Sequence, residues 1–118
     1  MAVDPEKYLP LTPKLFHMLL ALSEEPLNGY QLSLRVEDNS QGKIRLGPAS
    51  QYENVHRLRE EGLVEEAVGD PSLRPDGRKQ RFWRITEAGV LVLRAEVDRL
   101  SQDLDLALSS PRLRGAGR

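Results

Sequence analysis

The chain has 118 residues, of which 39% are hydrophobic and 30% charged, with a net charge of −1 and no cysteine. This composition is typical of a single soluble domain, and the lack of cysteine excludes disulfides and thiolate metal sites. No apolar run approaches the roughly 20 residues of a membrane span, and the N-terminus lacks the basic-then-apolar pattern of a signal peptide. We therefore expect a cytoplasmic protein with no membrane partner.

The charges are distributed unevenly along the chain. Residues 70–86 carry five cations against two aspartates, and residues 111–118 add three arginines without an acid. Acidic residues gather after Glu87 instead. The net charge speaks against a nucleic-acid partner, whereas a basic patch on an otherwise acidic protein is the electrostatic footprint of one.

The N-terminal part is predicted to be an arm followed by a central helix. Residues 1–11 contain two prolines and no hydrophobic period. Thr12 is placed to cap a helix that has Pro13 at its first position. The apolar residues that follow cover most of the helix circumference, which is typical of a helix in the middle of a small domain. His17 has no second ligand at a metal-binding spacing, so we expect no metal site there.

Asn28-Gly29 is a hairpin signal, but the residues before it have helical rather than alternating periodicity. We therefore predict that Asn28 caps a second helix, from about Gly29 to Asp38. A loop over residues 39–42 follows. Lys43 to Leu46 alternates polar and apolar residues, which indicates a short strand.

A third helix is predicted after Gly47, because Pro48 suits the first helical position. Gly62 is expected to end it in the left-handed conformation that glycine adopts most readily. Between these ends, Val55 and Leu58 follow Tyr52 at a spacing of three, which predicts an apolar face.

The other side of this helix is predicted to be polar and to carry Ser50, Glu53, Asn54 and Arg57. Side chains of these types can bond to the edges of DNA bases. The alternative is an ordinary solvated surface helix.

Two strands and a basic loop are predicted next. Leu63 to Val68 and Gln80 to Ile85 have strand-like patterns, and the residues between them contain turn chemistry. This hairpin is expected to act as a wing. Its basic loop is either a solvated turn or a surface that contacts DNA.

The last helix is predicted from Glu87 to about Ser109, with Thr86 as its cap. Its apolar residues follow the 3-4 spacing of a coiled-coil seam, so we expect a homodimer, with packing on the helix's own domain as the alternative. Residues 111–118 are expected to be a basic flexible tail. The predicted dimer interface consists of Val90, Leu93, Val97, Leu100, Leu104 and Ala107.

This order of elements indicates a mainly α protein with a small β-hairpin, in which residues 12–86 form a winged helix-turn-helix domain and residues 87–110 a dimerisation helix. In that fold the third helix enters the major groove. The chain resembles the PadR family of bacterial transcriptional regulators from about Leu11 to Leu108. The resemblance rests on the segments Asn28 to Tyr30, Leu46 to Tyr52, Arg57 to Val64 and Arg84 to Gly89.

The chain departs from the family pattern at two places. Family members usually have Thr-Leu-Tyr where this chain has Ser50-Gln51-Tyr52, so Gln51 replaces a packing residue and either reaches a base or weakens the packing. Some short members bind flat hydrophobic compounds between aromatic residues of the dimer helices. No aromatic residue follows Trp83 here, which speaks against such a compound and leaves open a small-molecule effector of unknown identity. Trp83 itself is expected to pack under the wing.

The expected function is that of a dimeric repressor that binds a palindromic operator in double-stranded DNA. The residues predicted to contact base edges are Ser50, Gln51, Asn54 and Arg57. The residues predicted to bind phosphates are Tyr30, Tyr52, Arg78, Lys79 and Arg81. Glu53 would repel a phosphate, so it either accepts from cytosine N4 or points aside.

Two other classes of function are weighed against this one. An enzyme finds little support, because the chain lacks a phosphate-binding glycine loop and a cluster of metal ligands; we expect no cofactor. A winged-helix adaptor that docks a partner protein remains the alternative, because the net charge is low and Glu53 lies on the polar face.

Overall fold

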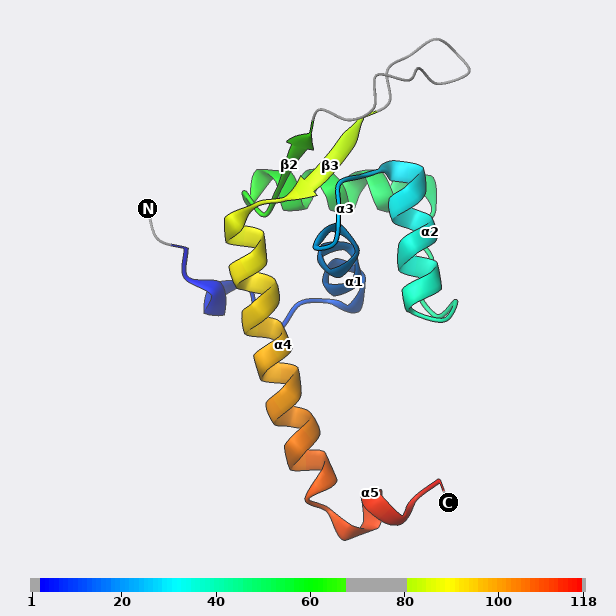
Figure 1. Ribbon diagram of the computed structural model, residues 1–118, viewed down its shortest axis with the longest axis vertical. Helices are drawn as coiled ribbons and strands as arrows, with labels where there is room; N and C mark the ends of the chain where they lie inside the picture. The colour runs from blue at the N-terminus through cyan, green and yellow to red at the C-terminus, as the bar shows by residue number, and fades with distance from the viewer. Residues whose placement is uncertain (1–2, 68–80, 118) are drawn as a thin grey trace.

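The computed structural model describes residues 3–67 and 81–117, and Figure 1 shows how their helices and strands are arranged. The elements in chain order are η1 (Pro5–Tyr8), α1 (Pro13–Leu22), β1 (Leu27–Asn28), α2 (Gly29–Asn39), α3 (Pro48–Glu60), β2 (Val64–Ala67), β3 (Phe82–Ile85), α4 (Glu87–Leu108) and α5 (Pro111–Gly115).

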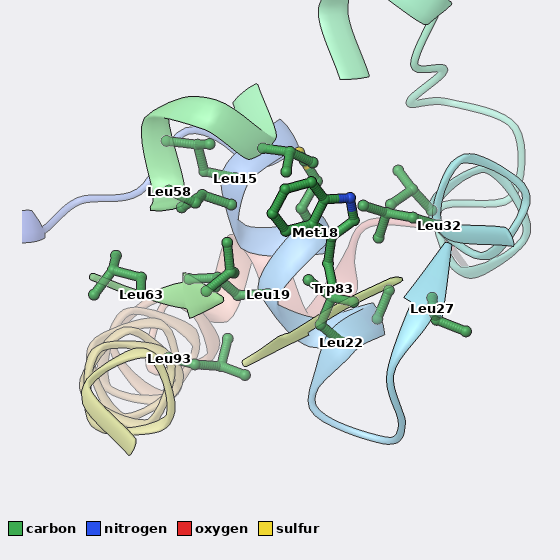
Figure 2. Packing of buried hydrophobic residues seen from close by; sticks show 14 of the residues in the cluster. Leu15, Met18, Leu19, Leu22, Leu27, Leu32, Leu58, Leu63, Trp83 and Leu93 are labelled. Atoms are coloured by element: carbon green, nitrogen blue, oxygen red, sulfur yellow. The ribbon is translucent and has the colours of Figure 1, made fainter. Parts of the chain in front are cut away.

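Helix α1 lies in the middle of the domain, surrounded by α2, α3 and α4 (Figure 1). It begins as predicted, because the Thr12 hydroxyl accepts from the Leu15 N–H at 3.2 Å and Pro13 occupies the first position. Figure 2 shows Met18 and Leu19 of α1 turned towards the side chains of the surrounding elements. Both are fully buried, so α1 is the helix on which the others pack.

Trp83 of β3 closes the core from the side of the sheet. Its ring lies beside Met18 and Leu32 in Figure 2, and only 5% of the residue is exposed. The prediction that Trp83 packs under the wing is therefore confirmed.

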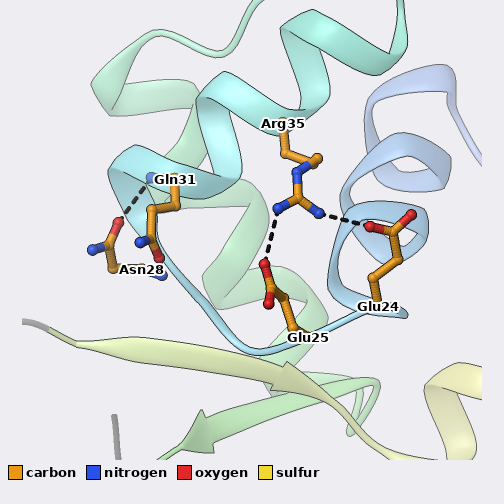
Figure 3. A network of polar contacts seen from close by, with 5 residues as sticks. All are labelled: Glu24, Glu25, Asn28, Gln31 and Arg35. Carbon is orange, nitrogen blue, oxygen red and sulfur yellow. Dashed lines mark hydrogen bonds and ion pairs between the residues drawn. The ribbon is translucent and has the colours of Figure 1, made fainter. Parts of the chain in front are cut away.

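Asn28 caps α2, as predicted, through a reciprocal capping box (Figure 3). Its side chain accepts from the Gln31 N–H at 2.8 Å, and the Gln31 side chain accepts from the Asn28 N–H at 3.1 Å. Arg35 then joins α2 to the connection that follows α1, since its two terminal nitrogens bind Glu24 at 2.8 Å and Glu25 at 2.9 Å.

The sheet has three strands in the order β1-β3-β2, and all its pairs are antiparallel. The sequence did not predict β1, Leu27–Asn28, which pairs with Trp83 and Phe82 of β3. The predicted strand at Lys43 to Leu46 is wrong. There the Ser40 hydroxyl accepts from the Ile44 N–H at 2.9 Å and donates to the Ile44 carbonyl at 3.3 Å, so the Ile44 backbone is bound within a loop.

Helix α3 begins and ends as predicted. Gly62 adopts a φ of +77°, and the N–H of Leu63 donates to the Leu58 carbonyl at 2.9 Å. The N–H of Gly62 donates to Arg59 at 3.0 Å, which completes the bonding pattern of a glycine-terminated helix. The predicted apolar face is wrong at Tyr52, which is 59% exposed, whereas Val55 and Leu58 are buried.

The end of α3, the wing and the start of α4 meet at Thr86. Its hydroxyl donates to the Gly62 carbonyl at 2.6 Å and accepts from the Gly89 N–H at 3.0 Å, which confirms Thr86 as the cap of α4. Its own N–H donates to the Leu63 carbonyl at 3.0 Å. A Cβ on Gly89 would lie 2.2 Å from that carbonyl oxygen, so only glycine lets α4 approach so closely.

The N-terminal segment, where no hydrophobic period was found, contains the short helix η1 and packs on α4. Val3, Tyr8, Leu9 and Leu11 contact the core as partly buried residues. The N–H of Leu11 donates to the carboxylate of Glu96 in α4 at 2.7 Å, so a hydrogen bond joins the start of the chain to the last long helix.

Glu96 is 1% exposed although it is charged. Its carboxylate accepts from the guanidinium of Arg99 as well as from Leu11. The hydrogen bond from Arg99, supported by the Leu11 N–H, holds the pKa of Glu96 below its ordinary value of 4.5 despite the opposing effect of burial. The ionised form is therefore the one that the fold binds.

Replacing Gly89 with alanine should destabilise the protein by about 1–3 kcal/mol, because the new methyl group forces α4 away from the Leu63 carbonyl. Urea unfolding followed by circular dichroism measures the change. Gly115→Ala is the control, since nothing lies within 4 Å of the Cβ that it adds. A Gly89→Ala protein as stable as the control would contradict the close approach.

Glu96→Gln should lower the free energy of unfolding by about 1–3 kcal/mol at neutral pH. A buried amide cannot accept with both of its terminal atoms, so the donors of Arg99 and Leu11 cannot all keep their partner. The Glu96 carboxylate has a lowered pKa in the folded state, so its contribution is complete above 4.5 and is lost as the pH falls through the lower folded value. The free energy of unfolding of the unaltered protein and of Glu96→Gln should therefore be measured from pH 7 to pH 3. The difference between the two should shrink below pH 4.5.

Glu65→Gln provides the matched control for this pH series. Glu65 pairs with Arg84 at 2.7 Å, but both side chains are about half exposed, so the change should cost about 0–1 kcal/mol. If the difference in the free energy of unfolding between the unaltered protein and Glu96→Gln stays constant across the pH range, the ionised Glu96 carboxylate does not stabilise the fold.

Candidate nucleic-acid interface

The side of α3 that faces away from the core is the candidate interface. Ala49, Glu53 and Glu60 form its outermost ridge, and all three are exposed. Arg57, next to this ridge, is exposed as well and forms an ion pair with Glu61 at 3.5 Å. Arg57 is therefore the predicted base reader that the structure leaves open to solvent, although a carboxylate partner lies one turn away.

Ser50 and Asn54 lie on the flank of α3 and are half-buried. The Asn54 amide donates to the Ser50 carbonyl at 2.8 Å and to the Ser50 hydroxyl at 3.2 Å. The ammonium of Lys14 in α1 donates to the same hydroxyl at 3.2 Å. These two predicted base readers are thus hydrogen-bonded to each other and to α1.

Gln51 lies on the inner side of α3 and is half-buried. A Cβ on Gly29 would lie 2.7 Å from its amide nitrogen, so the Gln51 side chain occupies the space left free by the glycine at the start of α2. The structure therefore places this residue at the contact between α2 and α3.

Tyr30 and Tyr52 project from the starts of α2 and α3 and are 75% and 59% exposed. The Tyr52 ring lies against the His56 ring, with 4.2 Å between the centroids. Both phenol groups are thus accessible at the surface.

On the wing, the described cations are paired with carboxylates of the neighbouring strand. Arg81 binds Glu66 through two nitrogens, at 3.3 and 3.1 Å. This hydrogen-bonded pair holds the pKa of the Glu66 carboxyl below its usual range. The Arg81 guanidinium also lies 5.0 Å from the centre of the Trp83 ring. Arg78 and Lys79, predicted as phosphate contacts, lie outside the described residues.

Sequence reasoning did not single out Lys14, which the structure places beside the candidate interface. A lysine in the first turn of a core helix carries no functional signal by itself. Its proximity to Ser50 arises only from the packing of α1 against α3.

Helix α4 carries the predicted dimer seam, and its C-terminal half extends away from α1, α2, α3 and the sheet (Figure 1). Val90, Val97, Leu100 and Leu104 are exposed, between 39% and 57%. Ala107 is exposed too. Leu93, in contrast, is only 7% exposed and belongs to the core of its own domain, so the structure divides the seam between two environments.

Within residues 3–67 and 81–117, no group of three or more histidine, aspartate and glutamate side chains could hold a metal ion. No helix in the same part of the chain is long and apolar enough to cross a membrane.

Three helices, a three-stranded antiparallel sheet and an appended long helix define the winged helix-turn-helix class, with α3 in the position of the recognition helix. The sequence model of the "Transcriptional regulator PadR-like family" matches residues 18–95. The chain belongs to this family, which consists of transcriptional regulators rather than enzymes.

Solved structures share this fold at low sequence identity. A PadR family transcription regulator from Clostridium difficile is 11% identical with a TM-score of 0.67, and the match covers 83% of this chain and 97% of that one. A transcriptional regulator from Clostridium thermocellum is 15% identical with a TM-score of 0.65, and the match covers 90% and 95% of the two chains.

An uncharacterised protein from Lysinibacillus sphaericus is 28% identical over 72 residues. The match covers 61% of this chain and 63% of that relative's length. The family match places the chain in a family of transcriptional regulators, and the solved structures share the predicted fold class.

Proposed function

We propose that the protein is a dimeric repressor that recognises a palindromic operator in double-stranded DNA, and that it acts in the cytoplasm. The observation that carries this proposal is the uncovered face of α3, on which Arg57 is exposed beside Ala49 and Glu53. In winged helix-turn-helix proteins the corresponding helix enters the major groove. A small-molecule effector of unknown identity remains part of the proposal.

Arg57 is the proposed base reader, because an exposed arginine can bond to both acceptors of a guanine. To read bases, Ser50 would first have to release Lys14, and Asn54 would have to release Ser50. Gln51 would have to leave the space beside Gly29. Glu53 projects from the outer ridge, where it favours a cytosine amine over a phosphate oxygen.

The proposed phosphate contacts are Tyr30 and Tyr52 on the helices and Arg81 on the wing, with Arg78 and Lys79 proposed from the sequence alone. Arg57 and Arg81 each have a carboxylate partner in the free protein. Binding DNA exchanges that carboxylate for a phosphate or base, which lowers the net gain per contact. We therefore expect weak binding to random DNA and a strong dependence on the preferred sequence.

The proposed dimer forms along the exposed apolar stripe of α4. Val97, Leu100 and Leu104 follow one another at spacings of three and four, so they share one helix face. Two such helices related by a two-fold axis would bury this face. The same symmetry would relate the two copies of α3, so we expect a palindromic operator with half-sites about one DNA turn apart.

Arg57→Ala should weaken binding to the preferred duplex by about 1–3 kcal/mol and reduce sequence preference, because a base contact is lost. Fluorescence anisotropy with a palindromic duplex, selected from random DNA, and with a scrambled duplex of equal length measures both effects. An equal loss on the two duplexes would instead assign Arg57 to phosphate contact.

Arg94→Ala is the matched control, because Arg94 is also an exposed helix arginine paired with a carboxylate four residues on, but it lies on α4. It should leave binding to both duplexes unchanged. If the unaltered protein binds no duplex at about 50 mM salt, where phosphate contacts are strongest, the adaptor function replaces the proposed one.

Leu100→Asp should convert dimers into monomers, because the substitution places a charge in the middle of the proposed interface. Sedimentation velocity measures the change in mass. Leu106→Asp is the control: Leu106 is 73% exposed and lies two residues from Leu104, on a different helix face. A monomeric unaltered protein, or equal effects of both substitutions, would rule out this seam.

A further inference from the structure

We propose that Lys14 in α1 binds a phosphate at one edge of the groove entered by α3, and that Ser50 and Asn54 hold its ammonium in place rather than reading bases. This role of Lys14 rests on the proposed function, since it requires α3 to bind DNA. It adds a residue outside the recognition helix and the wing to the set of DNA contacts.

The contacts among these three residues form a short chain from α3 to α1. The Asn54 amide donates to the Ser50 hydroxyl at 3.2 Å and to the Ser50 carbonyl at 2.8 Å. The hydroxyl oxygen also accepts from the Lys14 ammonium at 3.2 Å. An ammonium has three donors, so two remain for a phosphate after this bond is made.

Lys14 differs in its charge environment from the arginines near the interface. Arg57 pairs with Glu61, and Arg81 pairs with Glu66. No ion pair involves Lys14 in the part of the chain that the structure describes. A phosphate that meets this ammonium therefore does not have to displace a carboxylate first.

The position of Lys14 in α1 is not explained by the stability of that helix. Lys14 follows Pro13, the first residue of α1, and the first turn contains no acidic residue. A cation at the N-terminal end of a helix is unfavourable, because the unpaired N–H groups there already carry positive partial charge. The positive charge of Lys14 thus does not stabilise the start of α1, whereas the same charge would attract a DNA phosphate.

The flank of α3 that carries Ser50 and Asn54 suits a phosphate rather than a base. A helix with its side chains is about 10–12 Å wide, and the major groove is about 12 Å wide. The outer ridge with Ala49 and Glu53 would therefore face the base edges. The short side chains of Ser50 and Asn54 on the flank would lie nearer a backbone, whereas Arg57 on the same flank has a longer side chain that can extend towards the bases. Lys14 lies beside this flank, and its long side chain extends its reach.

The test uses Lys14→Gln, Ser50→Ala and Asn54→Ala in the full chain, with Arg94→Gln as the control cation on α4. Binding to the selected palindromic duplex and to a scrambled duplex is measured by anisotropy between about 50 and 200 mM salt. Thermal unfolding is measured in parallel, because a residue that only supports the fold would lower the melting temperature.

Lys14→Gln should lower the salt slope by about one on both duplexes, so the ratio of unaltered to variant affinity should grow about threefold as salt falls fourfold. Its melting temperature should be unchanged or slightly higher. Ser50→Ala and Asn54→Ala should weaken both duplexes by the same factor, without a change in preferred sequence. Arg94→Gln should have no effect.

An unchanged salt slope in Lys14→Gln, while the unaltered protein binds DNA, would overturn the role of Lys14 and leave the proposed function intact. A change in preferred sequence in Ser50→Ala or Asn54→Ala would return these residues to base reading. If the unaltered protein binds neither duplex, the proposed function and the role of Lys14 both fail.

Discussion

The contact between Thr86 and the end of α3 is the constraint on which the rest of the structure depends. Thr86 binds the Gly62 and Leu63 carbonyls through its hydroxyl and its N–H. The glycine at position 89 then lets α4 approach the same strand start. One small junction therefore fixes how the end of α3, the sheet and the start of α4 meet.

The elements that could be predicted from the sequence are those whose ends are determined locally. Thr12, Asn28 and Thr86 each bind an N–H three residues later, and this signal is contained in four residues of sequence. The pairing of Leu27 with Trp83 was missed because it joins distant segments, and two residues are too few for an alternating pattern. The buried Glu96 was missed for a similar reason, since the Leu11 N–H that it binds is backbone and leaves no mark in the sequence.

The candidate site was harder to predict than the fold. Serine and asparagine can read bases, but the same groups bind neighbouring backbone and side chains. Asn54 binds Ser50 one turn earlier in α3, and only the packing of α1 against α3 shows that Ser50 also binds Lys14. Tyr52 was assigned to the apolar face because a spacing of three fits more than one phase of a short helix. The exposure of Arg57 could be predicted without packing information, because Arg57 lies on the exposed side of α3 whether or not Tyr52 belongs to the apolar face.

The hydrogen bond from Leu11 to Glu96 joins two residues on either side of the part of the chain that matches the family. The stretch that matches the PadR-like family model runs from residue 18 to residue 95, so both partners of this bond lie outside it. In this chain, α4 is thus bound to an N-terminal residue that lies before the matched stretch. A substitution at Glu96 would remove the hydrogen bond between the N-terminal segment and α4 without changing any residue of the matched stretch.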